Sequence, residues 1–69
     1  MKKIKLGRYR HFKGNLYEVI DVVHHSETLE EMVLYKDKRA LWVRPLKMFL
    51  ENVVVNGIKV PRFKYLGDQ

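Results

Sequence analysis

The sequence predicts an all-β protein: a small SH3-like barrel of five to six short strands with one short helical turn. Three observations lead to this class. Gly, Pro, Asn and Ser divide the 69 residues into segments of strand length. The segments are rich in β-branched and aromatic residues, and only one short stretch has helical spacing. An OB-like barrel is the alternative, but its helix normally lies between the third and fourth strands, whereas here the helical stretch follows the fourth.

The first half of the chain predicts an aromatic extended segment, a turn and a longer strand, at residues 9–12, 13–15 and 16–24. Apolar residues fall on both sides of the longer strand: Leu16, Ile20 and Val22 on one side, and Tyr17, Val19 and Val23 on the other. A strand that is apolar on both sides suits a strong bend through which it contributes to two parts of a barrel.

The second half predicts a strand at 31–36, a turn at 37–39 and a strand at 40–44. Pro45 suits the first position of a helical turn, which Asn52 can end. Asn56 and Gly57 tolerate the positive φ angles of a two-residue type I′ turn, so residues 53–60 are predicted to form a hairpin. Pro61 kinks this hairpin, and a last strand follows at 62–66 with Phe63 and Tyr65 on one side.

Length and composition exclude several classes of function. The chain is short enough for one domain, residues 1–69 with a core at about 7–66, and a chain of this size is not expected to enclose a substrate pocket. It has no cysteine, which removes disulfides, thiolate zinc sites and cysteine nucleophiles. The basic start is followed by no apolar run of signal-peptide length, and no segment reaches the roughly 18 apolar residues of a membrane span. We therefore expect a cytoplasmic protein with no membrane partner and no cofactor.

The net charge of +6 favours polyanionic partners. The charge is unevenly distributed: residues 1–13 carry six Lys and Arg and no acid, residues 14–37 carry six acids and one lysine, and residues 38–69 carry seven basic residues and two acids. Two interpretations remain open. The basic residues solvate a small domain, or the two basic ends converge in space into one patch that contacts phosphates.

The stretch "HHSETLEE", residues 24–31, has the residue types of a catalytic or metal site. Neighbours on an extended chain point to opposite faces, so His25 and Ser26 do not form a triad, and the rings of His24 and His25 diverge. A metal would need His11 together with one of these histidines and several carboxylates. Ser26 and Thr28 instead suit a turn, and we interpret the stretch as a hairpin loop.

The strongest candidate for a binding surface is "LWVRPLKMF", residues 41–49. Trp42 and Arg44 alternate with two aliphatic residues, so they share one face of a strand, and this pair offers a stacking surface beside a bidentate donor. The alternative is that Trp42, the only tryptophan, lies in the core. The remaining candidates for the surface lie on or after the first strand, apart from one histidine of the loop: Tyr9, His11, Arg8, Arg10, Lys13 and His25.

Three ordered blocks, "YRHFKGNLYEVIDVVHHSETLEEMVLYK", "LWVRPLKMFLE" and "NGIKVPRF", resemble a short bacterial family known as domain of unknown function 1653. The resemblance covers roughly residues 7–66. It implies the architecture of a small β-barrel and no activity that can be carried over. The positions that match the family pattern are Tyr9, His11, Phe12, Gly14, Tyr17, Glu18, His25, Ser26, Glu27, Trp42, Val43, Arg44, Pro45, Met48, Phe49, Pro61, Arg62 and Phe63. The segment at 36–40 is shorter than the usual one.

Three hypotheses about function follow. The first is a non-catalytic binding module that engages nucleic acid, RNA or single-stranded, through phosphate contacts and aromatic stacking. The second is a protein or peptide interaction module, for which Trp and Arg serve equally well. The third is a metal-dependent activity at His11, His24 and His25. Self-association is a further prediction, because the basic ends and the acidic middle are complementary between copies.

Overall fold

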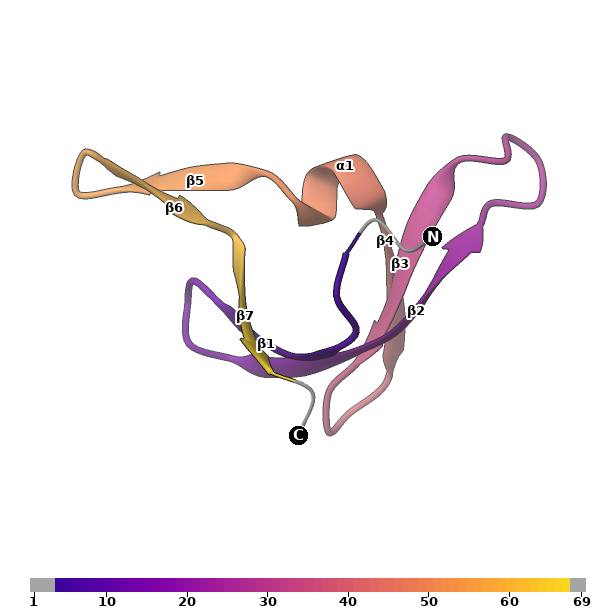
Figure 1. Cartoon of the computed structure of the whole chain (residues 1–69), viewed down its shortest axis with the longest axis horizontal. Coiled ribbons are helices and arrows are strands. Elements are labelled where there is room, and N and C mark those ends of the chain that lie inside the picture. Colours follow the sequence, from indigo (N-terminus) through magenta and orange to yellow (C-terminus); the bar gives the residue numbers. More distant parts are fainter. Residues whose placement is uncertain (1–3, 68–69) are drawn as a thin grey trace.

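The structure is a computed structural model and describes residues 4–67. Seven strands and one helical turn follow one another along the chain (Figure 1): β1 (Gly7–His11), β2 (Leu16–His24), β3 (Glu31–Lys36), β4 (Leu41–Pro45), α1 (Leu46–Phe49), β5 (Asn52–Val55), β6 (Ile58–Pro61) and β7 (Phe63–Gly67). Five strands form one antiparallel sheet in the order β4-β3-β2-β1-β7, and β5 and β6 form a separate two-stranded sheet. Most connections are short hairpins because consecutive strands pair with each other.

The core lies on one face of the five-stranded sheet, which we call the inner face. Phe49 of α1 sits against this face, where its ring stacks on Phe63 with 4.1 Å between centroids and contacts Tyr9 and Tyr35 edge-on at 5.3 and 5.7 Å. The buried residues are Ile4, Tyr9, Val19, Val33, Tyr35, Leu46, Phe49 and Phe63. Five of these eight side chains come from the sheet strands, so α1 and Ile4 close a core that the sheet alone leaves open to water.

Strand β2 bends where its pairing with β3 shifts register between Val19 and Asp21. A bulge of this kind adds one residue to one strand and turns the following side chains over. Val22 therefore lies opposite Val33, on the inner face, and packs against the core. The predicted bend is confirmed. The assignment of Val22 to the side of Leu16 and Ile20 is wrong, because strict alternation ends at the bulge.

Strands β5 and β6 form an arm that projects away from the main sheet (Figure 1). Asn56 and Gly57 have φ angles of 51° and 79°, as a type I′ turn requires, which confirms the predicted hairpin. After the arm, the Arg62 amide donates to the carbonyl of Glu51, and the chain enters β7. Pro61 lies at this junction, where its missing N–H interrupts no ladder within the main sheet.

The predicted all-β class with one short helical turn is confirmed, with seven strands rather than five to six. The sheet is not closed into a barrel: β4 and β7 are its two edges, and α1 and the arm come between them in the chain. The helical turn follows β4, as the sequence predicted, rather than preceding it as in an OB-like fold. Among residues 4–67 no helix is long and apolar enough to cross a membrane.

Candidate functional site

A group of aromatic and cationic side chains continues the inner face beyond the core. Residues directly opposite each other in antiparallel strands share one face. The pairings Tyr35 with Trp42 and Val33 with Arg44 therefore put Trp42 and Arg44 on the inner face of β4. In the same way, the pairing of His11 with Phe63 puts His11 on the inner face of β1. We call His11, Tyr17, Trp42 and Arg44, together with Tyr35 and Phe63 beneath them, the cation–aromatic site.

Three rings of this site pack edge to face around Phe63. His11 lies 4.9 Å from Phe63 at 78°, and Tyr17 and Tyr35 each lie 5.8 Å from it, between centroids. Tyr17 and Tyr35 also contact each other at 5.3 Å. Phe63 and Tyr35 are buried, whereas His11 and Tyr17 are half-buried. The buried rings thus form a rigid floor, and each half-buried ring leaves part of its surface open to a ligand.

Arg44 crosses this floor. Its guanidinium carbon lies 5.6 Å from the Phe63 centroid, and its Nε donates a long hydrogen bond of 3.5 Å to the hydroxyl of Tyr35. Within residues 4–67, Arg44 has no carboxylate partner, whereas Arg39 and Arg62 pair with Asp37 at 3.0 Å and Glu51 at 3.6 Å. A half-buried guanidinium that rests on aromatic rings without an acid is suited to bind an anionic group of a ligand.

The charged residues that shift the pKa of His11 are positive. Burial lowers the pKa of His11, and the charges of Arg62, Arg44 and Lys13 lower it further. The Nδ1 atom accepts a hydrogen bond of 3.2 Å from the Lys13 amide, so the neutral ring carries its proton on Nε2. A bound anion would reverse this effect by favouring the protonated imidazole.

Arg62 adds a further donor near His11. In the part of the chain that the structure describes, the Nε of Arg62 is buried and has no hydrogen-bond partner. Buried donors of this kind are rare, and they are satisfied by water or by a ligand group in most proteins.

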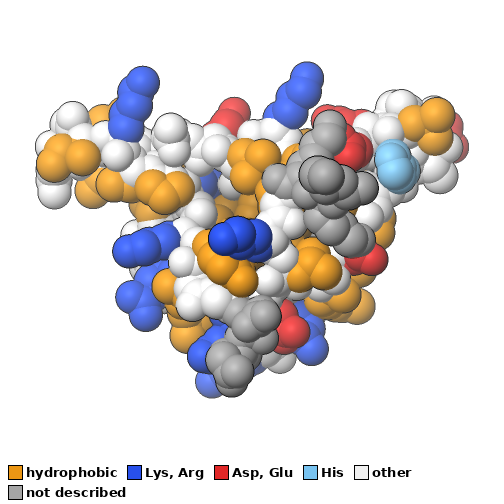
Figure 2. All heavy atoms as spheres, viewed as in Figure 1, with side chains coloured by type: hydrophobic (Ala, Val, Ile, Leu, Met, Phe, Trp, Pro, Cys, Tyr) orange, Lys and Arg blue, Asp and Glu red, His pale blue; other side chains and the backbone are white. Residues whose placement is uncertain are grey.

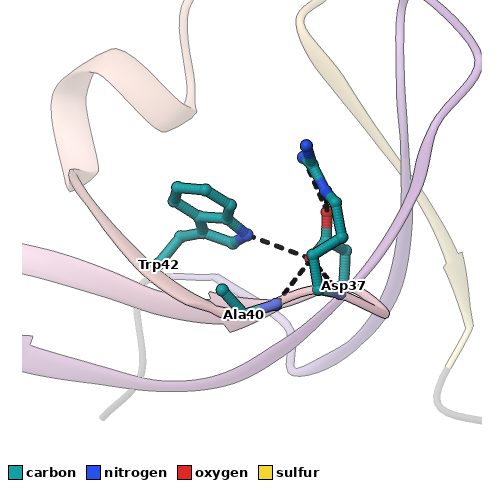
Figure 3. Close-up of polar contacts among 4 residues, drawn as sticks. Asp37, Ala40 and Trp42 are labelled. Carbon is teal, nitrogen blue, oxygen red and sulfur yellow. Dashed lines mark hydrogen bonds and ion pairs between the residues drawn. The ribbon is translucent and has the colours of Figure 1, made fainter.

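Trp42 is held in place by Asp37, in the turn between β3 and β4 (Figure 3). One carboxylate oxygen of Asp37 accepts hydrogen bonds from the Trp42 indole at 3.2 Å and from the Arg39 and Ala40 amides at 2.9 and 3.1 Å. The Arg39 guanidinium lies 5.5 Å from the indole ring. Burial alone would raise the pKa of Asp37, but the hydrogen bonds from Arg39, Trp42 and Ala40 outweigh it and hold that pKa well below its usual range.

Trp42 is 39 % exposed. It is therefore neither a core residue nor a free surface residue. Because its N–H is already bonded to Asp37, what it offers a ligand is its flat ring.

The predicted surface residues of β1 separate onto two faces. Tyr9 is buried in the core, where its hydroxyl donates to the Lys5 carbonyl at 2.6 Å, and burial raises its pKa. Arg8 and Arg10 are exposed on the opposite, outer face. His11 lies on the inner face, close enough to Arg44 and Lys13 for both charges to lower its pKa. On the outer face Arg10 of β1 lies opposite Lys64 of β7 in the strand register, so basic residues from the two ends of the chain are neighbours there.

The stretch "HHSETLEE" forms the hairpin between β2 and β3, as the sequence predicted: His24 ends β2, Glu31 begins β3, and residues 25–30 are the loop. His25 organises it: its Nδ1 accepts from the Glu27 amide at 3.1 Å, and its backbone N–H donates to the carbonyl of Glu30 at 2.8 Å. His24 is the last residue of β2, opposite Glu31 of β3, and His25 follows it in the loop, whereas His11 pairs with β7 at the far side of the sheet. Residues 4–67 contain no group of three or more His, Cys, Asp or Glu that would hold a metal ion. His25 is also distant from Trp42, which pairs with the other end of β3.

The sequence did not identify four residues of this region as parts of a site: Tyr17, Tyr35, Arg62 and Phe63. Tyr17 lies two residues from Val19, and Tyr35 two residues from Val33, in predicted strands, and this spacing puts each tyrosine on the same face as an apolar residue. The signal for Arg62 is weaker, because its place beside His11 depends on the pairing of β1 with β7.

Comparisons with known proteins identify the family. Residues 7–65 match the model of the family described as protein of unknown function (DUF1653). A crystal structure of a DUF1653 protein from Bordetella bronchiseptica is similar, with a TM-score of 0.87 and 32 % sequence identity over 97 % of this chain and 92 % of that chain. No curated protein matches the sequence. The family match spans most of the chain and the fold agrees with that of the Bordetella protein, so this chain belongs to the DUF1653 family.

Proposed function

We propose that this protein is a non-catalytic module that binds single-stranded nucleic acid across the cation–aromatic site, with RNA as the first candidate ligand. Arg44 carries the proposal. Its guanidinium rests on Phe63 without an acid partner among residues 4–67, next to the positive charges that surround His11. A phosphate placed there would meet Arg44, Lys13 and the Nε2 proton of His11.

The rings beside Arg44 suit the bases of such a ligand. Trp42 and Tyr17 are partly exposed on the same face, and stacking of a base on an aromatic ring contributes roughly 1–3 kcal/mol without demanding a particular base. Single strands present their bases for stacking, whereas a duplex hides them. The site therefore favours a single strand over a duplex and should bind single strands of different sequence with similar affinity.

The histidines support a role in binding rather than in catalysis. His11 and His25 each use Nδ1 to accept a backbone N–H of their own turn. A general base is usually oriented by a carboxylate or another acceptor at this nitrogen.

The test is a titration of fluorescently labelled, short, mixed-sequence RNA, followed by anisotropy at two salt concentrations. Arg44→Ala removes the central charge, and Arg8→Ala removes the same charge from the outer face as the matched control. Loss of a charged hydrogen bond of about 1.5–3 kcal/mol weakens binding by roughly 10- to 100-fold for Arg44→Ala, and Arg8→Ala has a much smaller effect. Equal losses in both variants would reject the cation–aromatic site as the place where RNA binds. A complex insensitive to salt, or no binding by the wild type, would reject nucleic acid as the ligand and favour a protein partner.

A further inference from the structure

A groove separates the arm from the edge of the main sheet. It has a volume of about 460 Å³ and is open to solvent. Val55 and Val60 of the arm and Phe12 form apolar walls, while Arg10 and Lys64 bring two positive charges to its border. Figure 2 shows hydrophobic side chains along the arm with Lys and Arg side chains beneath it, at the left of the view. The groove thus suits an apolar side chain that has acidic neighbours.

The arm needs a partner for its apolar face. Val53 is paired with Val60, and Val55 with Ile58, so these four aliphatic residues share one side of the hairpin. Ile58 is 65 % exposed, and within residues 4–67 no third strand pairs with β5 or β6. A two-stranded hairpin is marginally stable in water, and it gains stability when its apolar face is covered.

The loop between β2 and β3 carries an apolar side chain with acidic neighbours, which is the kind of group that the groove suits. Leu29 is 70 % exposed at the tip and has a φ of 63°, in the left-handed region that leucine rarely adopts. Hydrogen bonds fix the loop in this form: the Leu29 amide donates to the His25 carbonyl at 2.8 Å, and the Glu30 amide donates to the Thr28 hydroxyl at 3.2 Å. Glu27 and Glu30 flank the leucine and are exposed. The loop therefore presents one leucine between two acids in a fixed conformation.

We propose that the β2–β3 loop of a second copy of this chain docks into the groove, with Leu29 against Val55 and Val60. Glu27 and Glu30 of that copy then face Arg10 and Lys64, so the charges of loop and groove are complementary. The loop and the arm lie at opposite ends of the molecule (Figure 1). The contact is therefore head-to-tail, and it builds a closed ring or an open chain of copies rather than a two-fold dimer.

This proposal does not depend on nucleic-acid binding. The groove and the cation–aromatic site share only His11, and the variants below leave His11 and Arg44 unchanged. RNA binding can therefore succeed or fail without affecting the test.

Sedimentation velocity over a range of concentrations tests the contact through complementation. Leu29→Asp damages the loop and leaves the groove intact, while Val55→Asp damages the groove and leaves the loop intact. Each variant alone should associate at least about tenfold more weakly than the wild type. A mixture of the two retains one intact loop and one intact groove, so it should form a 1:1 complex and nothing larger. The matched control is Val54→Asp, because Val54 is 67 % exposed on the other side of the arm and its variant should associate like the wild type.

Leu29→Gly separates loss of the contact from loss of the fold. Glycine adopts the left-handed conformation without strain, so this variant should melt at a higher temperature and still fail to associate. The proposal is overturned by a wild type that remains monomeric at high concentration, by single variants that associate like the wild type, or by a mixture that forms no complex.

Discussion

Replacement of Leu29 by glycine is expected to stabilise the protein, although it removes a hydrophobic side chain. Leu29 has a φ of 63°, and a left-handed conformation costs an L-residue about 1–2 kcal/mol relative to the right-handed one. Glycine avoids this strain but has more freedom to lose on folding, a penalty of roughly 0.5–1 kcal/mol. The side chain is 70 % exposed, so little buried surface is lost in the monomer.

The difference leaves a gain in the free energy of unfolding of about 0.5–1 kcal/mol for Leu29→Gly. For a domain of this size, such a gain raises Tm by roughly 2–8 °C. Urea denaturation at low protein concentration, where self-association does not contribute, measures the change. Thr28→Gly is the control: it removes the hydroxyl that accepts the Glu30 amide and should lower stability. A Leu29→Gly variant less stable than the wild type would refute the claim that the loop is strained.

Three other predictions concern the core and the site. Phe49→Ala should destabilise the protein by about 3–5 kcal/mol in urea denaturation, because Phe49 is 1 % exposed and stacks on Phe63. The control Leu50→Ala should have a small effect, because Leu50 is 54 % exposed. Similar losses of stability in both variants would contradict the placement of α1. Asp37→Asn should loosen Trp42 and increase iodide quenching of its fluorescence, and unchanged quenching would argue against the bond to Asp37. The pKa of His11 is lower in the folded protein than its ordinary 6.5, so the unfolded chain binds more protons in this window, and stability should fall as pH drops below about 6.5. A His11→Asn variant should lose this part of the pH dependence, and an identical profile would contradict the cause given for it.

Local features of the sequence predicted much of the fold. The bounds 16–24 and 31–36 agree with β2 and β3, and the Asn56–Gly57 turn has its predicted geometry. The strands depend on their own content of β-branched residues, and the turn depends on the conformations that its two residues tolerate. Both properties can be read from a few consecutive residues.

Non-local pairings decided the rest. The bulge after Val19 arises from the register of β2 against β3, and the arm leaves the sheet because β7, rather than β6, pairs with β1. The failure of the sheet to close follows from the same pairings, which no local signal reveals.

The residues of the candidate site were also predictable where local features decide and unpredictable where non-local pairings decide. Alternation alone separates Tyr9 and His11 from Arg8 and Arg10, so the two faces of β1 were available from the sequence. The convergence of Arg44, Arg62 and Lys13 on His11 could not be predicted, because the four residues come from four places in the chain: β4, the junction before β7, the β1–β2 turn and β1.

The most direct test of ligand binding at the cation–aromatic site is an NMR titration of the isotope-labelled protein. The ligand is a short, mixed-sequence, single-stranded RNA, added at two salt concentrations. The single Trp42 indole N–H and the Arg44 Nε–H give resolvable side-chain signals on the inner face. We predict that these signals and the amide of His11 shift together, and that the shifts shrink at the higher salt concentration. No shifts, or shifts confined to Arg8, Arg10 and Lys64 on the outer face, would contradict the assignment of ligand binding to the cation–aromatic site.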